Sequence, residues 1–330
     1  MTPRERVNLT LRHEIPDRVP INYSANPGID SRLKQHLNVK NHKEFLKVLG
    51  VDFWGVNPPY NGPRLYSDIP ERGLKVDNFG GRLRWLAHGT GGYWEYCDFP
   101  LENADEEMVA NWKMPSPDHY NYEAAKWLCK QAEDFAVYVG HAGIADIING
   151  NSRLRGMEQT LIDLVTDNPA GLLLAKRRVD LQLEVIRRTI EACGDRVDFL
   201  WIGEDLGSQN GPLISPDVFR KHIRPLLQKF VDLARSFDLP VMIHSCGSSS
   251  WAFNDFIEMG ITAVDTLQPE AKDMSPEFLK SKFGKQLVLH GAITTGGAVA
   301  FGTVDEVRKY CKNVLEIMMP GGGYCFAPAH

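Results

Sequence analysis

The fold is decided by residues 197–247, which read VDFLWIGEDLGSQNGPLISPDVFRKHIRPLLQKFVDLARSFDLPVMIHSCG. Two short apolar runs, Val197–Ile202 and Pro240–His244, have the length and composition of buried strands. Between them, Ser215–Phe237 has helical periodicity and opens with Ser-Pro-Asp, which supplies an N-cap and a proline at the first helical position. A strand, a helix and a second strand in this order predict a βαβ unit with parallel strands.

The same alternation continues on both sides of this unit. Further helices are predicted at Asn168–Cys193, Ser250–Met259 and Thr303–Met318. The other strand-like runs, which bring the total to eight, are Arg18–Tyr23, Val51–Val56, Ala136–Gly140, Ile261–Thr266, Gln286–His290 and Gly323–Ala327. Eight strands alternating with helices over about 250 residues or more predict an α/β fold of the (β/α)8 TIM-barrel type. A doubly wound sheet would carry a Gly-x-Gly-x-x-Gly turn after an early strand, and the sequence has none.

One segment, from Asn57 to Asp118, is too long for an ordinary connection in such a barrel. It is rich in glycine, proline and aromatic residues, and short alternating runs at Leu74–Asp77, Arg82–Leu86 and Tyr93–Tyr96 predict a β-hairpin excursion. Long loops inside compact domains are usually lids or binding loops. We therefore expect a single barrel domain over residues 1–330, with an N-terminal extension and residues 57–118 inserted as a lid after the second strand.

Composition excludes several classes of partner. Lys and Arg number 37 against 42 Asp and Glu, so the net charge of −5 argues against nucleic acid. No apolar run approaches the ~20 residues that cross a bilayer, and the first 20 residues lack the apolar core of a signal peptide. The six cysteines lie far apart, and a chain of this size needs no disulfide framework. We expect a cytoplasmic protein without a membrane partner, and homo-oligomer formation stays open.

Polar residues gather at the carboxyl ends of the predicted strands, where a barrel builds its active site. Asp265 and His290 stand at two of these ends, and satisfied polar groups of the core are the alternative role for both. The residues expected to bind a substrate are Asn22, Tyr23, Gln209, Asp265 and His290, and the same edge carries Ser24, Asn57 and His141.

The sharpest local motif is His244-Ser245-Cys246-Gly247. Residues two apart on extended backbone point the same way, so the imidazole and the thiol can meet one ion. Zinc binds His nitrogen and Cys thiolate, and a catalytic zinc keeps one position open beside three protein ligands. A buried imidazole beside a small apolar thiol is the alternative, because His-x-Cys is common by chance. The position at a strand end, before a glycine turn, favours metal binding.

A third ligand must come from another strand, and the end of the chain offers His330 and Cys325. Cys325 lies inside the run Gly323–Ala327, below the rim. We predict His330 as the ligand, because it stands just beyond the strand end, at the level of His244 and Cys246, and Cys325 remains the alternative.

Two carboxylates, Glu204 and Asp205, follow the strand that ends at Ile202. Adjacent side chains at a strand end point to opposite sides, so only one of them can face the pocket freely. That one is a candidate fourth metal ligand, general base or hydrogen-bond acceptor for substrate. Capping of a helix or ordering of a loop is the alternative role. We take both as candidate catalytic residues.

Several motifs along the whole chain resemble the uroporphyrinogen-decarboxylase-like superfamily. They are Arg4–Val7 (RERV), Glu14–Pro20 (EIPDRVP), Leu213–Pro216 (LISP), His244–Gly247 (HSCG), Lys282–Gly284 (KFG) and Ala327–His330 (APAH). The resemblance implies a (β/α)8 barrel, in agreement with the strand count. Decarboxylases of this superfamily carry an arginine-rich segment after the first strand, which binds porphyrin carboxylates. The matching stretch here, Ile21–Gly28 (INYSANPG), contains no arginine, the residue best suited to bidentate carboxylate binding.

The resemblance therefore implies the other branch, the cobamide-dependent methyltransferases, whose zinc is held by a His-x-Cys pair and a cysteine near the C-terminus. His244 and Cys246 match that pair. His330 stands after Ala-Pro-x, where coenzyme M methyltransferases have their late cysteine, and Cys325 matches less well. The ending is similar to that of O-demethylating methyltransferases.

This similarity implies a zinc-dependent enzyme that moves a methyl group from a methoxylated, aromatic small molecule to the Co(I) corrinoid of a partner protein. Zinc with one thiolate and two imidazoles keeps a formal positive charge and polarises an ether oxygen more strongly than zinc with two thiolates. Two alternatives stay open. One is methyl transfer from a methylcobamide to a thiol, and the other is a non-enzymatic corrinoid- or tetrapyrrole-binding barrel with a structural metal.

Overall fold

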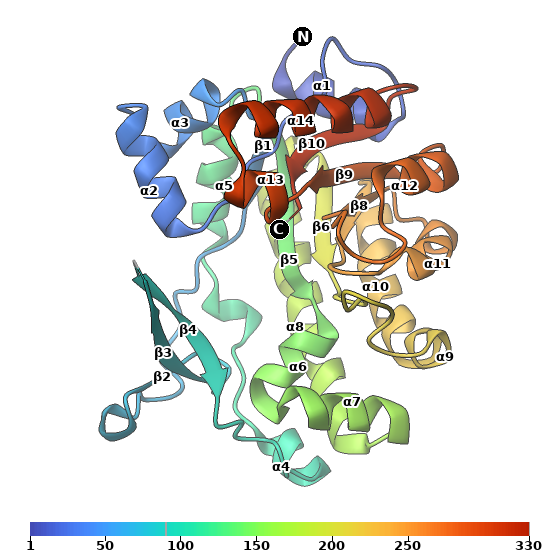
Figure 1. Ribbon diagram of the computed structural model, residues 1–330. Coiled ribbons are helices and arrows are strands. Elements are labelled where there is room, and N and C mark those ends of the chain that lie inside the picture. Colours follow the sequence, from blue (N-terminus) through green and yellow to red (C-terminus); the bar gives the residue numbers. More distant parts are fainter. Residues whose placement is uncertain (90, 330) are drawn as a thin grey trace.

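A curled sheet of parallel strands forms the centre of the molecule (Figure 1). The computed structural model describes residues 1–89 and 91–329. Within these residues the sheet has seven strands, in the order β1-β5-β6-β7-β8-β9-β10. Their bounds are Phe53–Val56 (β1), Ala136–Ala145 (β5), Phe199–Gly203 (β6), Val241–His244 (β7), Ala263–Asp265 (β8), Val288–Ile293 (β9) and Tyr324–Pro328 (β10). The predicted TIM-barrel class is confirmed, and seven of the eight predicted strands are present.

The remaining prediction, a strand over Arg18–Tyr23, was wrong: only Ile21 of this stretch pairs with the sheet. Ile21 forms a parallel bridge with Phe326 in β10, and its carbonyl accepts a hydrogen bond from the N–H of Asp52, next to β1, at 2.9 Å. The residue before it is Pro20, which has no N–H to donate to a ladder. On the other side, Phe326 donates to the carbonyl of Pro20 at 2.8 Å and accepts from the N–H of Asn22 at 2.9 Å, so one bridge closes the gap between the first and last strands of the sheet.

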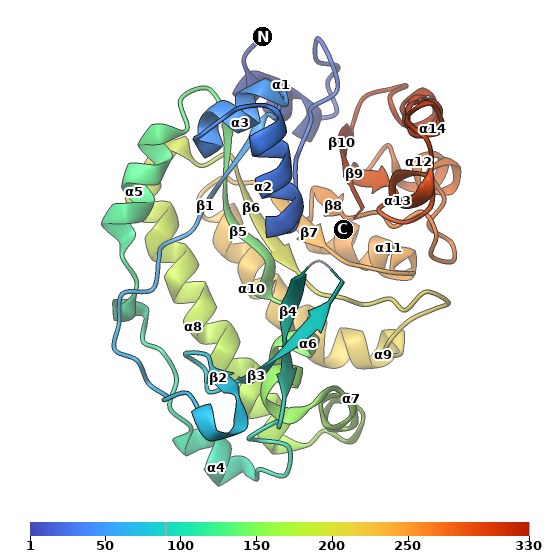
Figure 2. The same cartoon turned by 60° about the vertical axis from the view of Figure 1, so that its left-hand side comes forward.

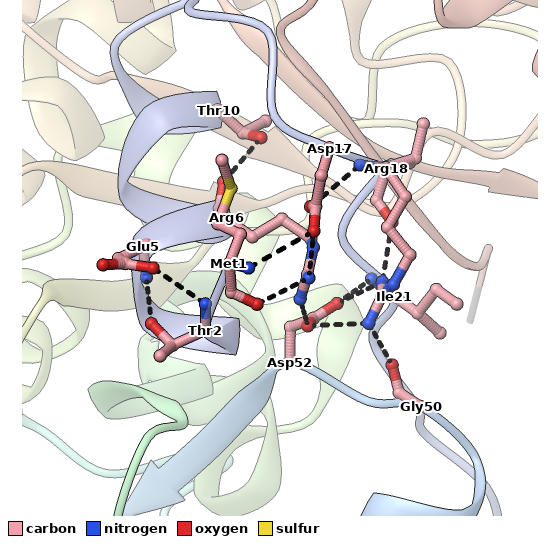
Figure 3. A network of polar contacts seen from close by, with 11 residues as sticks. Met1, Thr2, Glu5, Arg6, Thr10, Asp17, Arg18, Ile21, Gly50 and Asp52 are labelled. Carbon is pink, nitrogen blue, oxygen red and sulfur yellow. Dashed lines mark hydrogen bonds and ion pairs between the residues drawn. The ribbon is translucent and has the colours of Figure 1, made fainter.

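A buried polar network holds this closure in place (Figure 3). The carboxylate of Asp52 accepts hydrogen bonds from Arg6 Nη1 at 2.6 Å, from Arg18 Nη1 at 2.7 Å and from the backbone N–H of Ile21 at 2.8 Å. Arg6, on the first helix, also forms an ion pair with Asp17 at 2.7 Å. The N-terminal extension is therefore attached to the barrel through charged groups as well as apolar ones.

Helices pack around the outside of the sheet, where α5 contacts β1, α8 contacts β5, α10 contacts β6 and α14 contacts β9. None of the helices in the described part of the chain is long and apolar enough to cross a membrane. The α-helices are Pro3–Leu11 (α1), Pro27–His36 (α2), His42–Val48 (α3), Glu106–Asn111 (α4), Tyr122–Gln131 (α5), Ile147–Arg155 (α6), Met157–Thr166 (α7), Pro169–Cys193 (α8), Pro216–Val218 (α9), Arg224–Arg235 (α10), Phe253–Met259 (α11), Pro276–Phe283 (α12), Gly297–Phe301 (α13) and Val304–Met318 (α14).

The helices predicted at Asn168–Cys193 and Thr303–Met318 are found as α8 and α14, each with the N-cap expected from its first residue. The helix predicted over Ser215–Phe237 is divided into α9, a π-helical turn at Phe219–Ile223, and α10. Pro225 explains the division. It cannot donate a backbone hydrogen bond, and its ring would meet the carbonyl four residues earlier, so the preceding turn widens.

The insertion contains the expected β-structure, a three-stranded antiparallel sheet of β2 (Leu74–Val76), β3 (Arg82–His88) and β4 (Gly91–Cys97). Figure 2 shows this sheet beside α6, and the guanidinium of Arg153 on α6 lies 5.3 Å from the ring centre of Tyr96 on β4. A small separate apolar cluster, which includes Leu101, Leu154 and Leu174, joins the insertion to α6 and α8. The insertion is thereby packed onto the barrel at the side of β5.

Candidate metal centre

Three potential metal ligands, Asp205, His244 and Cys246, meet beyond the carboxyl ends of β6 and β7. Their donor atoms all lie within 4.8 Å of one another. His244 Nε2 is 3.1 Å from the sulfur of Cys246 and 3.6 Å from a carboxylate oxygen of Asp205. In the parallel register, Gly203 at the end of β6 pairs with His244 at the end of β7, which places Asp205 beside the imidazole. Nitrogen, sulfur and carboxylate oxygen are all ligands that zinc accepts.

A tight contact between two loops holds these groups together. The backbone N–H of Cys246 donates to Asp205 Oδ1 at 2.9 Å, and that of Ser248 donates to the carbonyl of Ser208 at 2.8 Å. Gly247, between the two donors, has φ +70°, and a Cβ there would lie 2.3 Å from the carbonyl oxygen of Gly207. Only glycine fits this position, so the turn after the His-x-Cys pair has a structural requirement of its own.

The carboxylate of Asp265 links two imidazoles. It accepts from Nδ1 of His244 at 2.6 Å and from Nδ1 of His290 at 2.5 Å. Residues 244, 265 and 290 are successive register partners in β7, β8 and β9, which puts their side chains on one face of the sheet. Burial opposes the charge of Asp265, but the neighbouring His290 and His244 lower its pKa to about 2. A carboxylate on the far nitrogen of a metal-binding histidine fixes the tautomer and turns the other nitrogen toward the metal.

Hydrogen bonds also fix the tautomer of His290. The side-chain oxygen of Asn22 accepts from the N–H of Tyr23 at 2.8 Å, so its amide nitrogen faces His290 Nε2 at 3.1 Å. An amide nitrogen only donates, so Nε2 of His290 accepts and its proton lies on Nδ1, where it bonds Asp265. Asn22 and His290, both predicted to bind substrate, thus belong to one chain of hydrogen bonds with the metal-binding group.

Glu204 and Asp205 have different surroundings. Glu204 is buried, and its two oxygens accept from the backbone N–H groups of Ile147 at 2.6 Å and Ile148 at 3.0 Å, at the start of α6. Burial and the nearby charge of Asp146 raise the pKa of Glu204 well above its usual value. Glu204 therefore orders the first turn of α6, while Asp205 faces His244 and Cys246.

A cavity of about 230 Å³ lies next to His244. Four of the predicted substrate-binding residues line it: Asn22, Tyr23, Asp265 and His290. The fifth, Gln209, lies in the loop after β6, where its side-chain oxygen accepts from Gln268 at 3.2 Å. Ser24 and His141, which the sequence places at the same edge, also line it, and three further lining residues, Tyr138, Trp201 and Thr266, were not predicted. The buried Nε1 of Trp201 has no hydrogen-bond partner among the described residues.

Of the two proposed third ligands, His330 lies outside the described residues. Cys325 is buried in β10 as the register partner of His290, and burial raises the pKa of its thiol. In a barrel whose strands tilt by ~36°, register partners are displaced along the barrel axis. Within residues 1–89 and 91–329, the clustered donor set contains Asp205 and not Cys325.

One further acidic residue, Asp146, was missed because the predicted strand was too short. The run Ala136–Gly140 indicated a strand end at His141, but β5 continues to Ala145 after an irregularity that begins at Gly140. Asp146 follows, in a left-handed conformation with φ +33°. Burial and the charge of Asp205 raise its pKa to about 6. Asp146 is therefore a second acidic residue close to Asp205 of the metal-binding group.

Comparisons with known proteins agree with this fold. The family model "Uroporphyrinogen decarboxylase (URO-D)" matches residues 99–330. A solved structure described as a methyltransferase from Methanosarcina mazei superposes with a TM-score of 0.63 at 19% sequence identity, over 100% of this chain and 93% of that one. No curated protein matches the sequence. Since the family match covers well over half of the sequence, this chain belongs to the uroporphyrinogen decarboxylase family.

Proposed function

We propose that this protein is a zinc-dependent methyltransferase. It would transfer a methyl group from a methoxylated, aromatic small molecule to the Co(I) corrinoid of a partner protein. The observation that carries the proposal is the group of Asp205, His244 and Cys246 beside a cavity, with Asp265 on the far side of the imidazole.

The donor set fits zinc. His244 offers Nε2, because Asp265 occupies Nδ1, and the sulfur of Cys246 faces the same point. We propose these two residues as ligands, His330 as the third, and Asp205 as the neighbouring carboxylate that completes or adjusts the site. A zinc ion held there would act as a Lewis acid on an ether oxygen, which stabilises the negative charge that develops as the methyl group leaves.

The residues of the cavity would bind and orient the methyl donor. The buried N–H of Trp201 has no partner in the described part of the chain, and the ring centres of Tyr138 and Trp201 lie 4.9 Å apart in an edge-to-face arrangement. Such aromatic walls favour a flat, apolar substrate. Asp265, buried and charged, would keep both imidazoles in place at the cavity wall.

Decarboxylation, the reaction in the family's name, is the weaker candidate. The stretch Ile21–Gly28 contains no arginine, and in the structure it supplies Asn22, Tyr23 and Ser24 to the cavity wall. The likeness to the Methanosarcina mazei protein, which is described as a methyltransferase, supports the proposed reaction class.

The test combines the zinc-loaded protein with a Co(I) corrinoid and a panel of methoxyaromatics, and follows the absorbance of methyl–cobalt. We expect methyl–cobalt to form with at least one ether and to be lost in Cys246→Ser. A matched control is Cys311→Ser, a half-buried cysteine on α14. Demethylation of methylcobalamin by a thiol, without ether activity, would support the thiol alternative. Corrinoid binding without either activity would support a non-enzymatic barrel.

A further inference from the structure

A second cavity, of about 220 Å³, lies between the insertion and the barrel. Its wall is largely apolar, with Phe79 from the insertion and Leu181 from α8. Two arginines line it as well, Arg153 on α6 and Arg178 on α8. His141 lines both this cavity and the one beside His244, so the two spaces share a wall at the irregular part of β5.

Arg178 is the unusual residue of this cavity. It is only 6% exposed, and the buried Nη1 of its guanidinium has no hydrogen-bond partner among the described residues. Burial lowers the pKa of Arg178 to about 10. The chain makes room for the group, because a Cβ on Gly150 of α6 would lie 1.7 Å from Nη1. A buried cation without a hydrogen-bonded partner is costly, and proteins usually supply a partner.

Two carboxylates near the cavity form no hydrogen bond to Arg178 among the described residues. Asp77 accepts from the N–H groups of Phe79 and Gly81, both at 2.8 Å, and from the hydroxyl of Tyr96 at 3.0 Å. Asp146 Oδ2 lies 3.6 Å from Arg153, and its Oδ1 is buried without a hydrogen-bond partner among the described residues. The charge of Asp146 also acts on Arg178, although no ion pair within 4.0 Å joins these two described residues. These two carboxylates add negative charge around the cavity, which disfavours a dianion such as phosphate and tolerates a monoanion.

We propose that this cavity binds a small-molecule carboxylate, with the guanidinium of Arg178 as the buried hydrogen-bond donor and Arg153 as a second cation. The apolar body of the ligand would pack on Phe79, Tyr120 and Leu181. A guanidinium is the group best suited to a planar carboxylate. On the function proposed above rests one further step: the carboxylate is the acid group of the methyl donor, and the donor extends past His141 toward His244.

Calorimetric titration of the protein without corrinoid or added zinc tests the site. The probes are benzoate, 4-methoxybenzoate and the neutral isostere 4-methoxybenzamide. We expect both carboxylates to bind, and the amide to bind at least about tenfold more weakly than 4-methoxybenzoate. Equal affinity for acid and amide, or no carboxylate binding at millimolar concentration, would overturn the proposal. This comparison needs no variant.

Arg178→Met should reduce carboxylate affinity to the level of the amide. Because Nη1 has no hydrogen-bond partner among the described residues, we expect this variant to unfold at the wild-type temperature or above it. The control is Lys176→Met, which removes an exposed cation from the same helix and should leave carboxylate affinity unchanged. Unchanged carboxylate affinity in a folded Arg178→Met would contradict the proposal. Carboxylate binding without methyl transfer would leave this site standing and reject only the proposed reaction.

Discussion

Asp265 holds His244 by a hydrogen bond of 2.6 Å to Nδ1, and the opposite ring nitrogen of His244 lies 3.1 Å from the sulfur of Cys246. The second oxygen of Asp265 holds His290 in the same way. One buried carboxylate thus sets the orientation of the imidazole at the metal-binding group and of the imidazole in the cavity wall.

Asp265→Asn tests this role. An amide can accept on one side only, so its nitrogen would face the N–H of either His244 or His290, and one ring would turn. We expect zinc affinity to fall by roughly 10–100-fold, as measured by competition with a chelator. The control is Asp232→Asn, an exposed carboxylate on α10. Unchanged zinc affinity in a folded Asp265→Asn would mean that Asp265 does not orient a ligand.

The third ligand is tested by His330→Ala and Cys325→Ser. We expect His330→Ala to lose zinc and ether demethylation, because a site with two ligands is weak. Cys325→Ser should keep both and cost about 1 kcal/mol of stability as a packing penalty. The zinc content of the two variants, measured by atomic spectroscopy, distinguishes His330 from Cys325 as the third ligand. Zinc loss in Cys325→Ser alone would reverse the assignment, and zinc loss in Asp205→Asn alone would make that carboxylate the third ligand.

Glu204→Gln separates a structural from a catalytic role. The side-chain NH₂ group of glutamine cannot accept, so either Ile147 or Ile148 would lose the acceptor of its backbone N–H. We expect a loss of about 1–3 kcal/mol in the free energy of unfolding, measured by urea denaturation, with zinc content unchanged. Full stability together with abolished methyl transfer would instead show Glu204 to act in catalysis. The exposed Glu258→Gln serves as the control.

Asp146 should make stability depend on pH. Its pKa is about 6 in the folded protein and near 3.9 in an unfolded chain. The folded state therefore binds this proton more tightly, so the contribution of Asp146 to stability is greatest below about pH 4 and falls as the pH rises to about 6. Asparagine tolerates the left-handed backbone at this position. We therefore expect the Asp146→Asn variant to be more stable than the wild type by roughly 1–3 kcal/mol at pH 7.

Urea denaturation at about pH 4 and at about pH 7 measures the effect. We expect the gain to disappear at the lower pH. Asp238→Asn is the matched control, since Asp238 is also left-handed, with φ +55°, but is exposed. A gain in Asp146→Asn that is the same at both pH values would show that the charge of Asp146 is not its cause.

The sequence predicted those parts of the fold that depend on local pattern. Apolar runs bounded by glycine, proline or charge located the seven strands, and Asn168 and Thr303 located the starts of two helices. Features that depend on distant partners were missed. Ile21 is an isolated bridge and not a strand because its N–H donates to the side chain of Asp52 and not to a backbone carbonyl, and because Pro20 has no N–H to extend the ladder. A hydrophobic pattern shows neither effect.

The candidate site, too, was predicted where it depends on local sequence and missed where it depends on distant partners. The His-x-Cys spacing singled out His244 and Cys246, but their proximity to Asp205 depends on the register between β6 and β7. The buried position of Arg178 could have been predicted from its spacing in the sequence. It follows Leu174 by four residues and precedes Leu181 by three, which places a charged residue on the buried stripe of α8.

The closure at Ile21 also has a consequence for how the barrel responds to its surroundings. Between β1 and Ile21, one of the two backbone links that a neighbouring strand would supply is replaced by the carboxylate of Asp52. Backbone pairing involves no formal charges, whereas this carboxylate lies between Arg6 and Arg18. Since Arg18 is 40% exposed, added salt reaches this ion pair, and high ionic strength should weaken the barrel at this closure more than at the other strand pairs.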